Sequence, residues 1–338
     1  MFLLLCCSVS RRNVQTLLPF QFKGLAQGTT YHVTYYASDS VVTGKDLTNI
    51  FLRIDSALSI YKPYSIISRF NDAGEKIKMD AHVKNVLEKA AVINRETNGI
   101  SDVTVYPLVE AWGFGPKSSQ DVPDSSIIQK ILPCVGAEKI EMTGDWLIKK
   151  EPCVKVDLNG IAQGYTVDVI SAVLEQHGIR NYLVEVGGEI RSKGSKQPGN
   201  TAFKIGIEAP ADNFDETIIK RVVYLKNGAM TTSGNYRRYY ESGGRMISHL
   251  INPKTGYPLN NELISVTVFA SDAITADGYD NALMGMGLKN AFAFLEKHKD
   301  LEAHFIFRTQ DGTVADTATN GFYNMLVIAE TAARAKDE

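Results

Sequence analysis

The segment SDAITADGYDNALMGMG, residues 271–287, predicts an apolar helix that carries two carboxylates and one amide near its beginning. Residues three and four apart share one face of a helix, so Asp277, Asp280 and Asn281 are expected to converge on one point. Oxygen-bearing groups of this kind suit a hard cation such as Mg²⁺. The alternative is an ordinary acidic first turn, in which the carboxylates complement the helix dipole without binding a ligand.

The composition is that of a globular protein that does not bind nucleic acid. The chain has 338 residues, of which 44% are hydrophobic, and 36 basic residues against 38 acidic ones give a formal charge of -2. No long run of like charge interrupts this balance. The basic surface expected of a nucleic-acid-binding protein is therefore absent.

The four cysteines fit neither a disulfide scaffold nor a metal-binding C-x-x-C motif. Cys6 and Cys7 are adjacent, whereas Cys134 and Cys153 lie far along the chain. Cys134 and Cys153 could pair with each other, but we expect free buried thiols.

The first 20 residues predict either the remnant of a signal or lipoprotein segment or a structureless tail. Their apolar run is too short to span a bilayer, and Arg11 and Arg12 follow it instead of preceding it. An acylated Cys6 or Cys7 would anchor the protein by lipid at the cell envelope, facing the periplasm.

The rest of the chain alternates strand and helix patterns irregularly, which favours an α+β fold over a doubly wound parallel sheet. The period of apolar residues predicts helices at 45–58 and 81–97, and a helix within the segment 158–177, which opens with glycines. Strands are expected at 28–37, 182–186, 203–208, 221–225, 246–251, 264–270, 303–307 and 322–328. No linker divides residues 24–334, so we expect one domain there.

Three further segments are candidates for ligand binding. Gly160 and Gly164 open the helix at 158–177, where free N–H groups favour an anion such as phosphate, although such glycines also occur in helices that bind nothing. Residues 231–236, TTSGNY, predict a hydroxyl-rich turn. His249 follows an expected strand and could move a proton near neutral pH, although a lone histidine is more often a capped strand end.

The order of these segments resembles the ApbE-like family, the FAD:protein FMN transferases, over residues 24–333. Eight segments carry the resemblance in sequence: GTTYHVTYY, SIYKPYSIISRFN, SDVTVYPLVEAWGFG, VDLNGIAQGYTVD, YLVEVGGEI, TTSGNYRRY, HLINPKTGYP and ADGYDNALMGMG. One such match could arise by chance, but the ordered series could not.

The resemblance implies an ApbE-like (T-fold-like) α+β fold with a flavin-binding cleft between two lobes, with FAD as substrate and Mg²⁺ beside the pyrophosphate. By motif, the metal would be held by Asp277, the backbone carbonyl of Ala162 and the side chain of Asn281. Tyr61 falls where the family often places an aromatic residue against the flavin. The family's nucleotide-binding segments correspond to Gly28, Thr29, Asp102, Thr104, Gly160, Gly164, Gly187, Gly188, Thr232, Ser233, Gly234 and His249.

The implied reaction is attack by a Thr or Ser hydroxyl of an acceptor protein on the FMN phosphorus, with release of AMP. His249 and Asp280 are the candidate bases. Family acceptors carry a segment resembling Asp-x-x-[Ser/Thr]-Gly-[Ala/Thr], typically in membrane redox subunits.

Four departures from the family pattern leave other functions open. Asn281 stands where threonine is frequent, Gln163 where lysine is common, Ser101 where phenylalanine is usual and Asn252 where aspartate is frequent. The alternatives are a protein that binds or stores FAD, and a pyrophosphatase that splits FAD with water.

Overall fold

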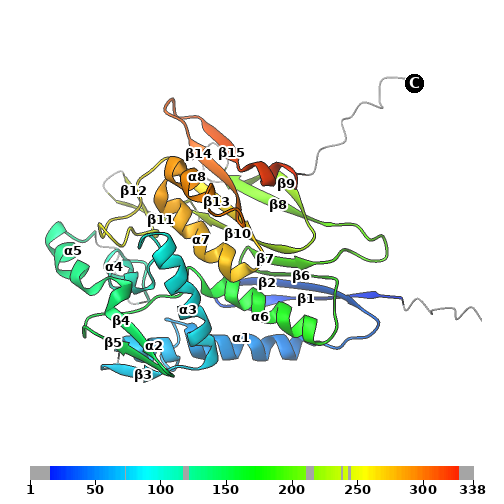
Figure 1. The fold of residues 1–338 in the computed structure, drawn as a ribbon, viewed down its shortest axis with the longest axis horizontal. Helices are drawn as coiled ribbons and strands as arrows, with labels where there is room; N and C mark the ends of the chain where they lie inside the picture. Colours follow the sequence, from blue (N-terminus) through cyan, green and yellow to red (C-terminus); the bar gives the residue numbers. More distant parts are fainter. Residues whose placement is uncertain are drawn as a thin grey trace, which may run out of the picture.

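The computed structural model describes residues 16–72, 74–116, 122–210, 217–236, 239–242 and 245–326. An antiparallel sheet of eight strands forms its centre (Figure 1). In spatial order the strands are β1 (Leu18–Ala26), β2 (Thr29–Ala37), β6 (Tyr182–Val186), β7 (Glu189–Lys193), β10 (Gly228–Gly234), β13 (Leu263–Ala270), β14 (Glu302–Arg308) and β15 (Val314–Ala318).

Both faces of this sheet are covered. Successive side chains of a strand point to opposite faces, and in β2 Val33 and Tyr35 join the main core while Tyr36 joins a second cluster. The seven residues Leu263–Phe269 of β13 are all buried, as expected for a strand that is covered on both sides.

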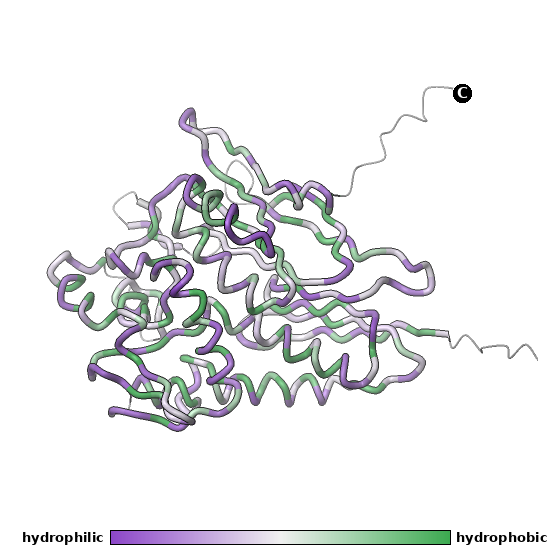
Figure 2. The backbone as a smooth tube through the Cα atoms, viewed as in Figure 1, coloured by the Kyte–Doolittle hydropathy of each residue, from purple (hydrophilic) through white to green (hydrophobic). Residues whose placement is uncertain are grey.

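Helices cover the face of the main core. They are α1 (Gly44–Leu58), α3 (Ala81–Glu96), α6 (Ala162–Gln176), α7 (Ala273–Met286) and α8 (Leu288–Leu295). Figure 1 shows α6 and α7 side by side across the sheet, where they contact each other. In α1, Leu47, Ile50, Phe51, Ile54 and Leu58 are buried, and hydrophobic and hydrophilic positions alternate along the helix in Figure 2.

A hairpin covers the opposite face. It consists of β8 (Phe203–Pro210) and β9 (Thr217–Leu225), and its residues Phe203, Ile205 and Val223 pack with Ile190 and Phe269 of the sheet. The short helix α9 (Asn320–Tyr323) adds the fully buried ring of Phe322 to this cluster.

A smaller lobe stands beside the main core. It contains α4 (Tyr106–Ala111), α5 (Ser125–Ile131), the 3₁₀ turns η1 (Val103–Val105), η2 (Leu132–Cys134) and η3 (Ala137–Lys139), and the hairpin of β11 (Tyr239–Ser242) and β12 (Arg245–Ser248). Leu108, Trp112, Phe114 and Ile128 form a separate apolar cluster in this lobe. Helix α2 (Ile66–Asp72) and the sheet of β3 (Lys76–Lys78), β5 (Trp146–Lys149) and β4 (Ile140–Thr143) complete the described chain.

The expectation of free thiols at Cys134 and Cys153 is wrong, because the two form a disulfide. Spacing along the chain could not show that η2 and the segment before α6 lie side by side. Cys6 and Cys7 lie outside the described residues.

The α+β class and most predicted elements are confirmed, with two corrections. The strand predicted at 322–328 is wrong in its described part, because α9 and a turn occupy residues 322–325, Leu326 forms only an isolated bridge with Val223, and β15 pairs with β14 instead. Residues 327 and 328 lie outside the described residues. Residues 231–234 are the end of β10 and not a turn. Helix α6 begins at Ala162, between Gly160 and Gly164, after the loop of Asp157–Ile161.

In the part of the chain that the structure describes, no helix has both the length and the apolar character needed to cross a membrane.

Candidate functional site

A cavity of about 350 Å³ lies between the main core and the smaller lobe. Ala90, Ile161 and Leu259 line it from the main core, and Val109, Phe114 and Ile251 line it from the lobe. The two lobes therefore meet at this cavity, and a ligand in it would contact both.

Helix α7 presents its polar residues to the cavity. Asp277, Asp280 and Asn281 all line it, and the two aspartates are only 4% and 1% exposed. They lie in the middle of the helix, whose N-cap is Asp272 and whose first turn contains no acidic residue. The alternative of an ordinary acidic first turn is therefore wrong, because that role needs solvent-exposed groups at the helix end.

Burial is the largest influence on the pKa of both aspartates. Burial raises the pKa of Asp277 to about 7, although a hydrogen bond from the N–H of Gly164 to Asp277 Oδ2 at 2.8 Å opposes the shift. Burial, and then the charge of Asp277, raise the pKa of Asp280 well above its ordinary value, whereas the hydroxyl of Thr231 and the N–H of Asn281 oppose this rise. Among the described residues, Asp280 Oδ1 has no hydrogen-bond donor in good geometry although it is buried. A buried acceptor of this kind leaves room for a further partner.

The charged side chains that line the cavity are acidic. Asp102, Asp157 and Glu189 line it together with the two aspartates of α7. Among the described residues that line the cavity there is no lysine or arginine, and Gln163 is neutral. An anionic ligand would therefore need a cation that the side chains do not supply.

The oxygens at this place fit a magnesium ion. In the described chain no three His, Cys, Asp or Glu side chains are arranged to hold a metal, so a site must include amide or backbone oxygens. Asn281 Oδ1 accepts from Ser233 Oγ at 2.9 Å, and its second lone pair leaves room for a further partner. The carbonyl of Gly160 accepts from Asn281 Nδ2 at 3.3 Å, which places the loop before α6 beside α7. All these donors are hard oxygens, the ligands that Mg²⁺ prefers.

Ala162 is the first residue of α6 and does not line the cavity in this structure. Its carbonyl accepts from Thr166 Oγ1 at 2.8 Å. The role predicted for this carbonyl, and for Asp277 and Asn281 as metal ligands, stays a prediction.

Several predicted nucleotide-binding residues come together in the cavity. The residues that line it are Asp102, Gly160, Gly187, Thr232, Ser233, Gly234 and His249. Gly187 has a φ of +66°, and a Cβ there would lie 2.6 Å from Gln163 Nε2 and 2.9 Å from Thr29 Cγ2. A side chain at this position would therefore both strain the backbone and collide with the cavity wall.

Other predicted residues do not line the cavity, and two have structural roles instead. Gly164 donates its N–H to Asp277, so that N–H is not available to an anion. Thr104 Oγ1 accepts from the N–H of Gly136 at 2.7 Å and donates to Asp102 Oδ1 at 2.5 Å. The remaining residues outside the wall are Gly28, Thr29, Gly188 and Tyr61, whose side chain is half exposed.

Asp102 lines the cavity, but its carboxylate oxygens accept hydrogen bonds from neighbouring residues. They accept from the N–H groups of Thr104 and Ala137 and from the side-chain amide of Asn94. Burial raises the pKa of Asp102, and these hydrogen bonds oppose that rise.

His249 follows β12 and lines the cavity. Its ring meets the ring of Phe114 edge-on, with centroids 6.2 Å apart. The loop after it is folded by Asn252, whose Oδ1 accepts from the N–H of Lys254 at 2.9 Å. Asparagine at this position therefore caps the turn, as an aspartate would.

Phe114, Asp157, Asn159 and Glu189 are among the residues of the cavity wall to which sequence reasoning assigned no role. All four fall inside the motifs quoted above, so these motifs were recognised without a role for these residues. Glu189 lies in β7, a strand that was not predicted.

Comparisons with known proteins agree on one family. The model of the ApbE family matches residues 27–305. A Haemophilus influenzae protein named FAD:protein FMN transferase is 37% identical over 309 residues, 88% of this chain and 88% of the relative. A Vibrio cholerae protein of the same name is 36% identical over 86% of this chain and 87% of its own.

Solved structures agree as well. The flavin transferase ApbE of Vibrio cholerae matches with a TM-score of 0.82 at 33% identity, over 92% of this chain and 100% of that chain. The apo form of the Pseudomonas stutzeri flavinyl transferase ApbE matches with a TM-score of 0.82 at 31% identity, over 93% of this chain and 98% of that chain.

Proposed function

The chain belongs to the ApbE family, and from this we propose that it is an FAD:protein FMN transferase, an enzyme that moves FMN from FAD to a protein. The observation that supports this function best is the cavity between the lobes, where two buried aspartates face a wall whose described residues include no lysine or arginine. Such a wall suits a pyrophosphate only when a cation accompanies it.

We assign the cation site to Asp277, the side chain of Asn281 and the carbonyl of Ala162, with Mg²⁺ as the ion. When bound, the ion would neutralise the pyrophosphate and stabilise the charge on the leaving phosphate. Two observations support this assignment: Asp277 and Asn281 both line the cavity, and the described residues that line it include no lysine or arginine.

The chain's own residues would orient the substrate and handle the proton. A Ser or Thr hydroxyl of the acceptor forms a bond to the FMN phosphorus, the bond from that phosphorus to the bridging oxygen breaks, and AMP leaves with that oxygen. His249 or Asp280 would take the proton of the attacking hydroxyl. Thr232, Ser233 and Gly234 at the end of β10 line the same cavity and would bind the nucleotide.

Tyr61 is proposed to stack on the flavin ring, and the half-exposed position of its side chain leaves the ring free to be covered by a ligand. Tyr61→Ala should weaken binding of FAD and leave binding of ADP unchanged, because ADP lacks the flavin. Equal affinities for FAD before and after the substitution would reject the stacking role.

The acceptor is proposed to be a membrane redox subunit that carries an Asp-x-x-[Ser/Thr]-Gly-[Ala/Thr] segment, and the protein is proposed to act in the envelope, anchored by lipid near its N-terminus. The disulfide between Cys134 and Cys153 supports a location outside the cytoplasm, because disulfides persist in oxidising compartments.

The test is to incubate the purified protein with FAD, MgCl₂ and a peptide that carries the acceptor segment. We expect an FMN mass increment on the peptide, an equal amount of AMP, and the loss of both in EDTA. The matched control is the same peptide with its Ser or Thr replaced by Ala, which should gain no mass.

Two results would reject the transferase assignment. AMP without a modified peptide would identify a pyrophosphatase, since water would then be the acceptor. Bound but intact FAD would identify a protein that binds or stores the flavin.

A further inference from the structure

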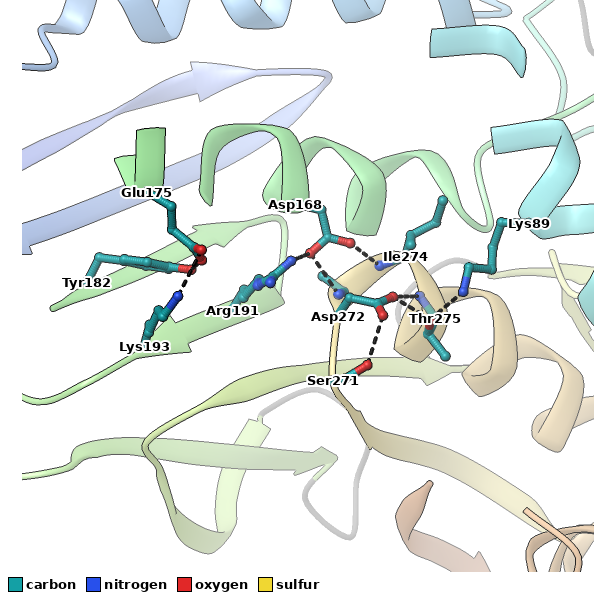
Figure 3. A network of polar contacts seen from close by, with 11 residues as sticks. Lys89, Asp168, Glu175, Tyr182, Arg191, Lys193, Ser271, Asp272, Ile274 and Thr275 are labelled. Carbon is teal, nitrogen blue, oxygen red and sulfur yellow. Dashed lines mark hydrogen bonds and ion pairs between the residues drawn. The ribbon is translucent and has the colours of Figure 1, made fainter. Parts of the chain in front are cut away.

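A side chain of α6 holds the beginning of α7. Asp168 Oδ1 accepts from the N–H of Ala273 at 3.0 Å, and Asp168 Oδ2 accepts from the N–H of Ile274 at 2.8 Å (Figure 3). The first N–H groups of a helix have no partner within that helix, so these bonds satisfy two of them. Helix α7 also has its own cap, because Asp272 accepts from the N–H of Thr275 at 3.0 Å. The two aspartates thus act at one helix end, but only Asp168 comes from another element.

Asp168 forms an ion pair and is mostly covered. The Nη1 of Arg191, from β7, lies 2.5 Å from Asp168 Oδ1, and the side chain of Asp168 is only 13% exposed. Figure 3 shows the carboxylate between the guanidinium and the end of α7. Asp168 does not line the cavity and therefore cannot itself contact a ligand there.

A second bond joins the same two helices one turn away. Gly164 precedes Asp168 by four residues and donates its N–H to Asp277 Oδ2, and Asp277 follows Ala273 by four residues. Residues four apart lie on one face of a helix. The Gly164–Asp277 and Asp168–Ala273 hydrogen bonds therefore lie one turn apart along the same interface between two antiparallel helices. The helices are so close here that a Cβ on Gly164 would lie 2.3 Å from the carbonyl oxygen of Ala273.

We propose that Asp168 is a positioning residue that fixes the register of α7 against α6 and thereby places Asp277 for the divalent cation. This inference rests on the proposed cation site. It concerns a residue that acts through Asp277, because Asp168 holds the end of the helix on which Asp277 stands.

The experiment measures Mg²⁺ binding to the full-length protein by titration calorimetry with MgCl₂ alone, together with the melting temperature. Asp168→Asn should weaken Mg²⁺ binding roughly tenfold to a hundredfold, the range found when groups that orient metal ligands are removed. Asp272→Asn is the matched control, because it removes the same charge at the same helix end while the hydrogen bonds of Asp272 are to Ser271 and Thr275, its neighbours in the chain. Asparagine caps a helix about as well as aspartate, so this variant should keep a melting temperature close to that of the wild type and leave Mg²⁺ affinity unchanged.

Asp168→Glu provides a second variant if Asp168→Asn does not fold. It keeps the charge opposite Arg191 but adds one methylene between the helices, so we expect a folded protein with weaker Mg²⁺ binding. Wild-type affinity in the folded Asp168 variants would overturn this inference alone. Equal weakening in Asp272→Asn would also overturn it, since any loosening of that helix end would then suffice. Absence of Mg²⁺ binding by the wild-type protein would overturn the proposed cation site as well.

Discussion

At the scale of single residues, the site depends on where two aspartates of α7 are buried. Asp277 and Asp280 lie in the middle turns of α7 and face a cavity. Burial raises the pKa of both carboxyl groups. Buried carboxyl groups without a cation are costly when charged, so the metal-free protein should hold a proton there more tightly than an unfolded chain does.

The first prediction concerns the pH dependence of stability. The pKa of Asp277 is about 7 in the folded protein and about 3.9 in an unfolded chain, so the folded state binds more protons between these values. Its contribution to the free energy of unfolding is complete below about pH 4 and falls as the pH rises towards 7, by up to about 1.4 kcal/mol per pH unit. Urea unfolding of Asp277→Asn in EDTA should show a smaller fall than the wild-type protein over this range.

The control for this measurement is Asp300→Asn, which changes an exposed aspartate in the turn before β14. It should reproduce the wild-type pH dependence. An Asp277→Asn profile parallel to that of the wild-type protein would show that Asp277 titrates normally.

A second prediction separates proton transfer from binding at His249. His249→Asn should lower the rate of FMN transfer by about 10²-fold or more, the range for loss of a general base, while FAD affinity changes little. Single-turnover rates and equilibrium FAD titrations measure the two effects separately. His177→Asn, at the exposed end of α6, should change neither. A large loss of FAD affinity at an unchanged rate would make His249 a binding residue.

At the scale of elements, the cavity wall depends on contacts between segments distant in the chain. The side chains of Thr104 and Asp102 accept hydrogen bonds from the N–H groups of Gly136 and Ala137, respectively. These two residues follow the disulfide-bonded Cys134. Cys153, on the other side of the disulfide, precedes the segment that leads to Asp157, whose N–H donates to the carbonyl of Val103. The disulfide therefore joins two segments that both support this wall.

The third prediction is that removal of this disulfide destabilises the protein. The cysteines are 19 residues apart, and a loop of that length corresponds to about 3 kcal/mol in the chain-entropy model. The variant with both Cys134→Ser and Cys153→Ser should have a free energy of unfolding lower by about this amount and so unfold at a lower urea concentration, and the reduced wild-type protein should behave like it. A variant with the wild-type midpoint would contradict the disulfide.

At the scale of the whole molecule, the two lobes enclose a cavity with five carboxylates and, among the described residues that line it, no lysine or arginine. FAD carries a negatively charged pyrophosphate, which such a wall repels. Its binding should therefore depend on Mg²⁺ much more than the binding of riboflavin, which has no phosphate.

The fourth prediction tests this balance of charge with Gln163→Lys. A lysine in the cavity wall should supply part of the missing positive charge, so FAD affinity measured in EDTA should rise roughly tenfold. Gln176→Lys adds the same charge at the far, exposed end of α6 and should have no effect. Equal effects of both substitutions would indicate long-range attraction instead of a contact at the site.

The sequence by itself determined the α+β class, the helices with a strong apolar period and the residues of α7 that face the cavity. These features follow from local rules, because Asp277 and Asn281 are four residues apart on one helix and the apolar stripe of α1 repeats with the helical period. The order of motifs also pointed to the family that the comparisons show.

Only the tertiary structure decided which of these residues meet. The strand character of residues 231–234 comes from pairing with β13, and the disulfide comes from the packing of η2 beside the segment before α6. Asp277 accepts a hydrogen bond from Gly164, and Asp168 accepts one from Ala273 at the beginning of α7. Both bonds join residues more than a hundred positions apart. Chain neighbours cannot specify such contacts, because they form only when the sheet brings α6 and α7 together.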